Sequence, residues 1–232
     1  MANNYHQEIL TLIRQQSGTP TQHTFLDSYL GNDHPRYPIN APTLRRIAKD
    51  WMRAHREMSP IEFSKLLSSL VQGKSSTEKC MVGILLDNST SDQRKFDPKL
   101  FDRWLNHVEG WAEVDSICTG EYTVTEILAD WKKWKSLLVQ FSKSKNINKR
   151  RASIVLLCSP LRRVNDERLA TIALANVERL KTEKEILITK AISWVLRSME
   201  KYYRKELTAY LQENMNTLPK IAVRETLAKL KT

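Results

Sequence analysis

The chain has 232 residues, 41% of them hydrophobic and 27% charged, with a formal net charge of +11 and only 6 Gly. This length allows one large core or a stack of small ones. The sequence has no apolar run of about 18 residues, so we expect no membrane span. The first residues do not have the pattern of a secretory leader, so we expect a cytoplasmic protein. Three cysteines and five scattered histidines have no ligand spacing, so we expect reduced core thiols and neither a metal nor a cofactor.

The first part of the chain has helical spacing of apolar residues. We expect helices over residues 3–16 and 21–30, then a loop at 31–41 that contains two prolines. Pro42 suits the first turn of a further helix. The predicted core stripe of that helix consists of Leu44, Ile47, Ala48, Trp51 and Met52.

From residue 59 onward the predicted helices follow one another in pairs. Three capping boxes mark helix starts: Ser59 with Glu62, Ser75 with Glu78, and Thr182 with Glu185. The second helices of the pairs begin near residues 77, 111, 148, 183 and 219, a period of about 34–37 residues. This pattern predicts an all-α fold, an α-solenoid of antiparallel helix pairs of the HEAT or armadillo kind, in a single domain over residues 1–232.

The positive charge is concentrated in the second half of the chain. Residues 1–110 carry 14 basic and 12 acidic side chains, roughly +2, whereas residues 111–232 carry 23 and 14, roughly +9. Such an excess favours a polyanion partner bound on a concave basic face, and general solubility charge is the alternative.

The segment GWAEVDSIC contains the first candidate site. Trp111 and Asp115 are four residues apart and therefore share one helix face, beside an apolar stripe. Asp115 is either a buried carboxylate with a polar partner, a functional group, or a solvated helix residue.

Two later segments combine basic and apolar residues. In TKAISWVLR, Lys190, Trp194 and Arg197 fall on one helix face, a pattern expected of a surface that receives a sugar-phosphate chain. Packing of this Trp against the next repeat is the alternative. In NKRRASIVLLC, Arg150 and Arg151 adjoin an apolar run, so at least one guanidinium is expected to emerge from the helix.

In this order, GWAEVDSIC, NKRRASIVLL and KAISWVLRSMEK resemble the AlkD family of DNA alkylation-repair glycosylases, and APTLRRIAK resembles an earlier segment of the same family. The resemblance covers residues 25–230. It implies a HEAT-like solenoid that cradles duplex DNA and hydrolyses the N-glycosidic bond of cationic N3- or N7-alkylated purines, in base excision repair. The implied protein acts as a monomer on nucleoid DNA.

The resemblance also implies roles for individual residues. The catalytic Asp falls on Asp115, with Trp111, Arg151 and Trp194 beside the lesion. Gly110 is a departure, because relatives often have a further Trp there. Lys149, Arg150, Lys190 and Arg197 are the further DNA-binding candidates.

Two other functions agree with the same features. A non-catalytic solenoid would bind nucleic acid through the basic face without releasing a base. A protein-interaction scaffold, which is a common use of helical repeats, would carry the charge incidentally.

Overall fold

The computed structural model describes residues 4–21 and 31–231, and these residues form helices without any β-strand among them. The chain divides into two compact units, Met1–Gly120 and Glu121–Thr232, and each is described by itself. The predicted all-α fold is confirmed, while the single domain stays a prediction. The helix expected at 21–30 falls, apart from Thr21, outside the described residues. In the described part, no helix combines the length and the apolar character needed to cross a bilayer.

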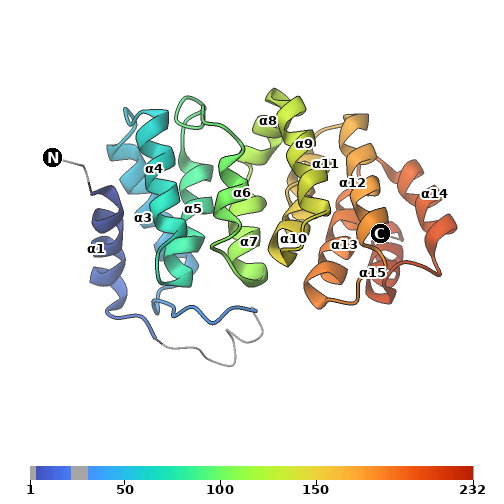
Figure 1. The fold of residues 1–232 in the computed structure, drawn as a ribbon, viewed down its shortest axis with the longest axis horizontal. Helices are drawn as coiled ribbons and strands as arrows, with labels where there is room; N and C mark the ends of the chain where they lie inside the picture. The colour runs from blue at the N-terminus through green and yellow to red at the C-terminus, as the bar shows by residue number, and fades with distance from the viewer. Residues whose placement is uncertain (1–3, 22–30, 232) are drawn as a thin grey trace. The chain divides into compact units, whose positions relative to one another are not determined.

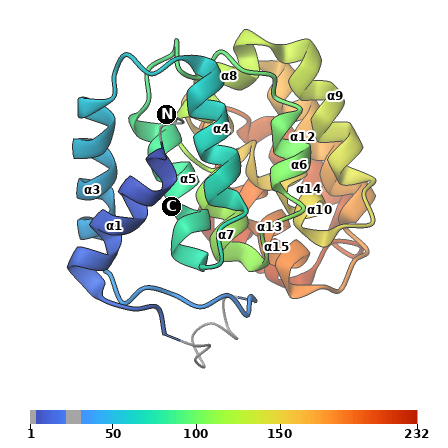
Figure 2. The same ribbon diagram turned by 60° about the vertical axis from the view of Figure 1, so that its left-hand side comes forward.

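The first unit consists of two sets of helices that pack side by side (Figures 1 and 2). One set is α3, α5 and α7 in succession, and the other is α1, α4 and α6. Their bounds are α1 Tyr5–Ser17, α3 Ala41–Ala54, α4 Pro60–Val71, α5 Ser76–Asn88, α6 Leu100–Trp104 and α7 Gly110–Cys118.

Local sequence signals set the starts and the buried faces of these helices. The capping boxes at Ser59 and Ser75 are both formed, so α4 and α5 begin where predicted. The stripe expected for α3, from Leu44 to Met52, is buried as a whole. The core of the unit therefore lies between the two sets of helices.

In the second unit, α10, α13 and α15 pack in succession, with α9 and α12 against them and α11 between α8 and α13 (Figure 1). The bounds are α8 Tyr122–Ala129, α9 Trp131–Ser142, α10 Ile147–Val155, α11 Cys158–Arg163, α12 Glu167–Leu180, α13 Ile186–Ser198, α14 Arg204–Asn214 and α15 Lys220–Leu230.

The predicted repeat agrees with the observed second helices. These begin at residues 76, 110, 147, 186 and 220, within one residue of prediction except for the fourth. The prediction of a capping box at Thr182 and Glu185 is wrong, because α13 begins only at Ile186 and the described chain forms no side-chain cap there. The segment before α13 instead holds Glu183 against Arg150.

Two further differences concern the helices around α10. The predicted continuous run into Cys158 breaks at Val155, and the chain restarts as α11. Pro160 explains the break, because proline lacks an N–H and clashes with the carbonyl four residues earlier, whereas it is tolerated in the first turn of a new helix. The short helix α8 was not predicted.

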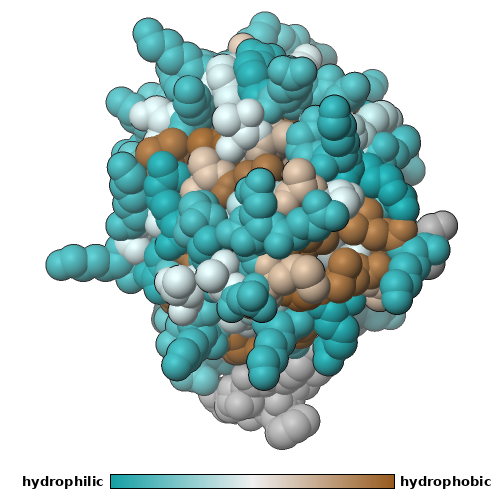
Figure 3. Space-filling model, turned by 90° about the vertical axis from the view of Figure 1, so that its right-hand side faces the viewer, coloured by the Kyte–Doolittle hydropathy of each residue, from teal (hydrophilic) through white to brown (hydrophobic). Residues whose placement is uncertain are grey.

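The end of the second unit carries apolar side chains between hydrophilic ones (Figure 3). Helices α14 and α15 are the last helices that the structure describes. Met215 is 47% exposed, and several apolar residues of α15 are half-buried.

Candidate functional site

Trp111 and Asp115 lie one turn apart on α7. Asp115 is 9% exposed, Trp111 is half-buried, and the neighbouring Val114, Ile117 and Cys118 are fully buried. Asp115 is therefore a largely buried carboxylate at the edge of the core, and its interpretation as a solvated helix residue is wrong. A buried acid retains its charge only where polar groups compensate for lost hydration, which makes it costly as a purely structural residue.

The first residue of α7 explains the departure at position 110. Gly110 has φ = 67°, in the left-handed region that side chains with a Cβ rarely adopt. A Trp at this position would strain the backbone. The turn that leads into α7 in this chain therefore requires glycine, and Trp111 is the first aromatic residue of the helix.

In the second unit, α10 carries the two adjacent arginines. Arg150 binds Glu183 through two nitrogens, with Nε–Oε1 at 2.8 Å and Nη2–Oε2 at 3.0 Å. Its Nη1 also donates to the carbonyls of Ser144 and Lys145. Arg150 is half-buried, and its positive charge is paired with the carboxylate of Glu183. The guanidinium that was expected to emerge from the helix is therefore only partly exposed to solvent.

Arg151 is 4% exposed, and its Nη1 donates to the carbonyl of Leu187 on α13. This bond joins α10 to α13 within the second unit. Lys149, one residue earlier, is half-buried. The bond to Leu187 and the burial of the side chain fix the position of the Arg151 guanidinium. A fixed guanidinium suits a group that has to bind a ligand in one defined geometry.

Helix α13 presents the predicted combination of an aromatic ring and two cations. Lys190 is exposed, whereas Trp194 and Arg197 are half-buried. Arg197 forms an ion pair with Glu225 on α15, at 3.4 Å, and Glu225 also accepts a hydrogen bond from Ser193 at 2.5 Å. The positive charge of Arg197 is therefore partly offset, and Lys190 is the more accessible cation of this face.

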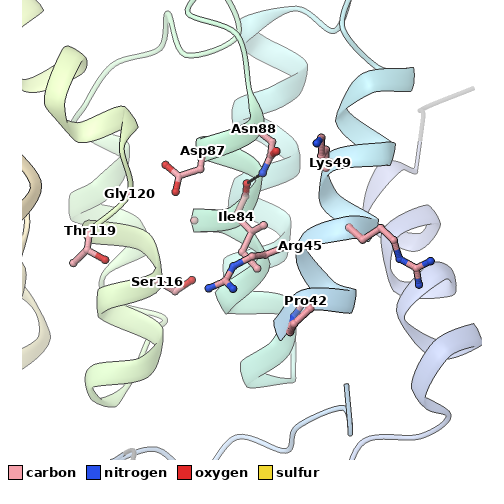
Figure 4. Close-up of a pocket in the computed structure, with 11 residues that line it drawn as sticks. Pro42, Arg45, Lys49, Ile84, Asp87, Asn88, Ser116, Thr119 and Gly120 are labelled. Atoms are coloured by element: carbon pink, nitrogen blue, oxygen red, sulfur yellow. Dashed lines mark hydrogen bonds between the residues drawn. The ribbon is translucent and has the colours of Figure 1, made fainter. Parts of the chain in front are cut away.

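Sequence analysis did not single out a basic pocket in the first unit (Figure 4). The pocket has a volume of about 590 Å³ and lies between α3, α5 and α7. Figure 4 shows the Arg45 side chain extending from α3 toward Ser116 on α7, with Asp87 on the intervening α5. The complete lining is Pro42, Arg45, Arg46, Lys49, Gly83, Ile84, Asp87, Asn88, Ser116, Thr119 and Gly120.

This pocket adjoins the turn that carries Asp115. The hydroxyl and the backbone amide of Thr119 both donate to the carbonyl of Asp115, at 2.7 and 3.0 Å. Arg45 and Lys49 are four residues apart on α3, which is the spacing that could have identified this basic face from the sequence. Residues 1–110 carry nearly equal numbers of basic and acidic side chains, so their net charge did not indicate this basic face.

The predicted site residues are distributed over both units. Trp111 and Asp115 belong to the first unit, while Lys149, Arg150, Arg151, Lys190, Trp194 and Arg197 belong to the second. Within the described ranges, no group of three or more His, Cys, Asp or Glu side chains has the arrangement of a metal site.

Comparisons with known proteins add a family context. A sequence model of the family described as "DNA alkylation repair enzyme" matches residues 14–230. Among solved structures, a "predicted DNA alkylation repair enzyme" from Enterococcus faecalis aligns with a TM-score of 0.67 and 15% sequence identity, over 97% of this chain and 94% of that chain. At this identity the structural likeness concerns the fold. No match was found among curated proteins.

Proposed function

The chain belongs to the DNA alkylation repair enzyme family, and from this premise we propose that it is a DNA glycosylase. Its substrate would be duplex DNA that contains a cationic N3- or N7-alkylated purine, and the reaction would be hydrolysis of the N-glycosidic bond. The observation that carries this proposal is the largely buried carboxylate of Asp115, one helical turn from the half-exposed ring of Trp111.

The leaving group explains why so few residues would suffice. An N3- or N7-alkylated purine is a cation and departs as a neutral base, so it needs little help from a general acid. Positive charge develops instead on the deoxyribose. A fixed carboxylate can stabilise that charge and hold the attacking water, as Asp115 would do.

The aromatic and basic residues would position the DNA. Trp111 and Trp194 would pack on the sugar-phosphate chain and keep the sugar at a short distance from the carboxylate. Arg151 would bind a phosphate through charge-assisted hydrogen bonds. Arg150 suits that role less well, because its donors are already occupied by Glu183 and two carbonyls.

The remaining cations would supply sequence-independent affinity. Lys149, Lys190 and Arg197 would contact phosphates from the second unit. In the first unit, Arg45 and Lys49 of the basic pocket would contact a phosphate near the turn that carries Asp115. The proposed enzyme works without a cofactor and as a monomer.

Substitution of Asp115 by Asn tests the proposed chemistry. The amide keeps nearly the same shape but lacks the charge, so excision of 7-methylguanine should fall about 100-fold or more, which corresponds to a loss of a few kcal/mol of transition-state stabilisation. Asp92→Asn is the matched control, because Asp92 is an exposed acid of the same unit that does not line the pocket. DNA binding should survive in both variants.

The choice of base tests the leaving-group argument. The parent protein should release 7-methylguanine and 3-methyladenine but not uracil, because uracil would leave as an anion and needs stabilisation that these residues do not offer. Efficient uracil release would refute the leaving-group argument. DNA binding without release of any methylated purine would favour the non-catalytic alternative.

The two tryptophans provide a third test. Replacement of Trp111 or Trp194 by Ala should slow excision while most of the stability remains, because both rings are only half-buried. Trp104 is 2% exposed and is the control, since a core Trp→Ala change costs about 3–5 kcal/mol. A comparable loss of stability on removal of Trp111 or Trp194 would assign that ring to the core.

A further inference from the structure

The turn before α7 is held by groups other than an ordinary helix cap. The side chain of Glu109, at the N-cap position, forms no capping hydrogen bond within the described chain. The next residue, Gly110, has the left-handed backbone noted above. Because the first amides of a helix have no partner inside the helix, the direction in which α7 begins has to be fixed by other contacts.

Glu113 supplies one of these contacts from inside the protein. Its side chain is fully buried, and its Oε2 accepts a hydrogen bond from the backbone amide of Glu109 at 2.8 Å. Its Oε1 lies 2.9 Å from Nδ1 of His34, a residue 79 positions earlier in the chain. One buried carboxylate thus connects the start of α7 to the segment that precedes α3.

The segment that contains His34 is itself fixed against α5. The carbonyl of Pro35 accepts a hydrogen bond from the amide of Ser76 at 2.9 Å. The amide of Tyr37 donates to the Thr77 hydroxyl at 3.0 Å. The bond from His34 to Glu113 therefore anchors α7 to a part of the chain with a defined position.

Lys79 holds the same turn from α5. It is 4% exposed, and its Nζ donates to the carbonyls of Val71 and His107 at 2.8 and 2.7 Å. Burial lowers the pKa of Lys79, and the nearby negative charge of Glu113 opposes that shift. The turn at residues 107–109 is thus held at His107 by a buried cation and at Glu109 by a buried anion.

We propose that Glu113 is a positioning residue for the proposed reaction, which fixes the first turn of α7 and thereby the direction of Trp111 and Asp115. This inference rests on the proposed function. Glu113 touches neither substrate nor reacting atoms in this role. Its effect follows from distance, because a shift of about 1 Å in a catalytic group can reduce a rate about 100-fold.

The test compares Glu113→Ala, Glu113→Gln and His34→Ala with the control Glu109→Ala. Glu109 has the same charge and is exposed on the same turn, but only its backbone takes part in the contact. Each variant is assayed for single-turnover excision of 7-methylguanine, for affinity to undamaged duplex DNA, for melting temperature and for amide hydrogen exchange over residues 109–115.

We expect Glu113→Ala to lower the single-turnover rate at least about 10-fold, with DNA affinity changed less than about 3-fold, and to speed amide exchange at the start of α7. Glu113→Gln should restore most of the rate, because its amide oxygen still accepts from the Glu109 amide. Glu109→Ala should behave as the parent. Should Glu113→Ala fail to fold, His34→Ala decides, since it leaves Glu113 in place but removes the contact that anchors this carboxylate to the segment before α3, so its excision rate should fall as well.

The possible results separate the two proposals. A folded Glu113→Ala or His34→Ala protein with the parental excision rate would overturn the positioning role, whatever its exchange. Equal loss of rate in Glu113→Gln and Glu113→Ala would also overturn it, because the hydrogen bond would then be irrelevant. Absence of excision in the parent protein would refute the proposed function, while the exchange data would still report whether Glu113 holds α7.

Discussion

Helices α5 and α7 pack closely at Gly83, and substitution of this residue by Ala is expected to be strongly destabilising. A Cβ built at Gly83 would lie 1.6 Å from the carbonyl oxygen of Ser116, whereas real Cβ contacts are essentially never under 3.0 Å. The atom it meets belongs to the backbone, so no side-chain rotation relieves the overlap. The two helices would have to separate by about 1.4 Å.

The expected loss of stability follows from three contributions. Overpacking of a core costs about 1–3 kcal/mol, and a backbone overlap belongs at the upper end of that range. Separation would also break the bond from the Ser116 hydroxyl to the carbonyl of Cys80, at 2.7 Å, which contributes about 1 kcal/mol. Ala has a higher helix propensity than Gly, which offsets about 1 kcal/mol of this loss of stability. The net loss is therefore about 3 kcal/mol.

Urea denaturation measures this loss. With a slope of about 2 kcal/mol per M, Gly83→Ala should lower the unfolding midpoint by about 1.5 M. Ser116→Ala is the control, because it removes the hydrogen bond without any overlap and should cost only about 1 kcal/mol. Because α7 carries Asp115, excision should fall as well. A Gly83→Ala protein that is as stable as Ser116→Ala would refute the overlap argument.

Three further outcomes are expected. Burial raises the pKa of Glu78, but the hydrogen bonds from His6 and Ser75 outweigh burial and hold this pKa below 4.5. The stability that the ionised Glu78 gains from these hydrogen bonds is therefore present above about pH 4.5 and is lost on acidification. The melting temperature should fall below about pH 4.5 in the parent protein, and it should fall less in Glu78→Gln. Desolvation of the half-buried Cys80, and then the charge of Glu113, raise the pKa of its thiol to about 12, so labelling by a thiol reagent at neutral pH should be slow in the folded protein and fast in denaturant. Rapid labelling of the native protein would contradict this raised pKa. Arg45→Gln should lower the slope of log affinity for DNA against log salt by about one unit if the basic pocket binds a phosphate, and an unchanged slope would remove it from the proposed interface.

Local patterns in the sequence determined the helical elements and their repeat. Ser59 and Ser75 each satisfy amides of the following helix with their own side chains, so the starts of α4 and α5 depend only on residues three apart. The apolar spacing of α3 likewise specifies which of its faces is buried. For the same reason, the periodic second helices were predicted to within one residue at four of five positions. These features depend on neighbours in the chain.

The candidate site was identified only in part from the sequence. The shared helix face of Trp111 and Asp115 follows from their spacing, but spacing is the same for a solvated and a buried carboxylate. Packing in the first unit decided that Asp115 is 9% exposed. The basic pocket was missed because its cations on α3 line it together with Ser116 and Thr119, more than 60 residues later in the sequence.

Tertiary structure alone decided how the charged residues are used. Arg150 is bound to Glu183, 33 residues away, in the segment that precedes α13. Glu113 lies two residues before the proposed catalytic acid in the sequence, yet its partner His34 is 79 residues distant. Periodicity specifies the face on which a residue lies, whereas the partner that a charged group meets depends on which distant segments fold against that face.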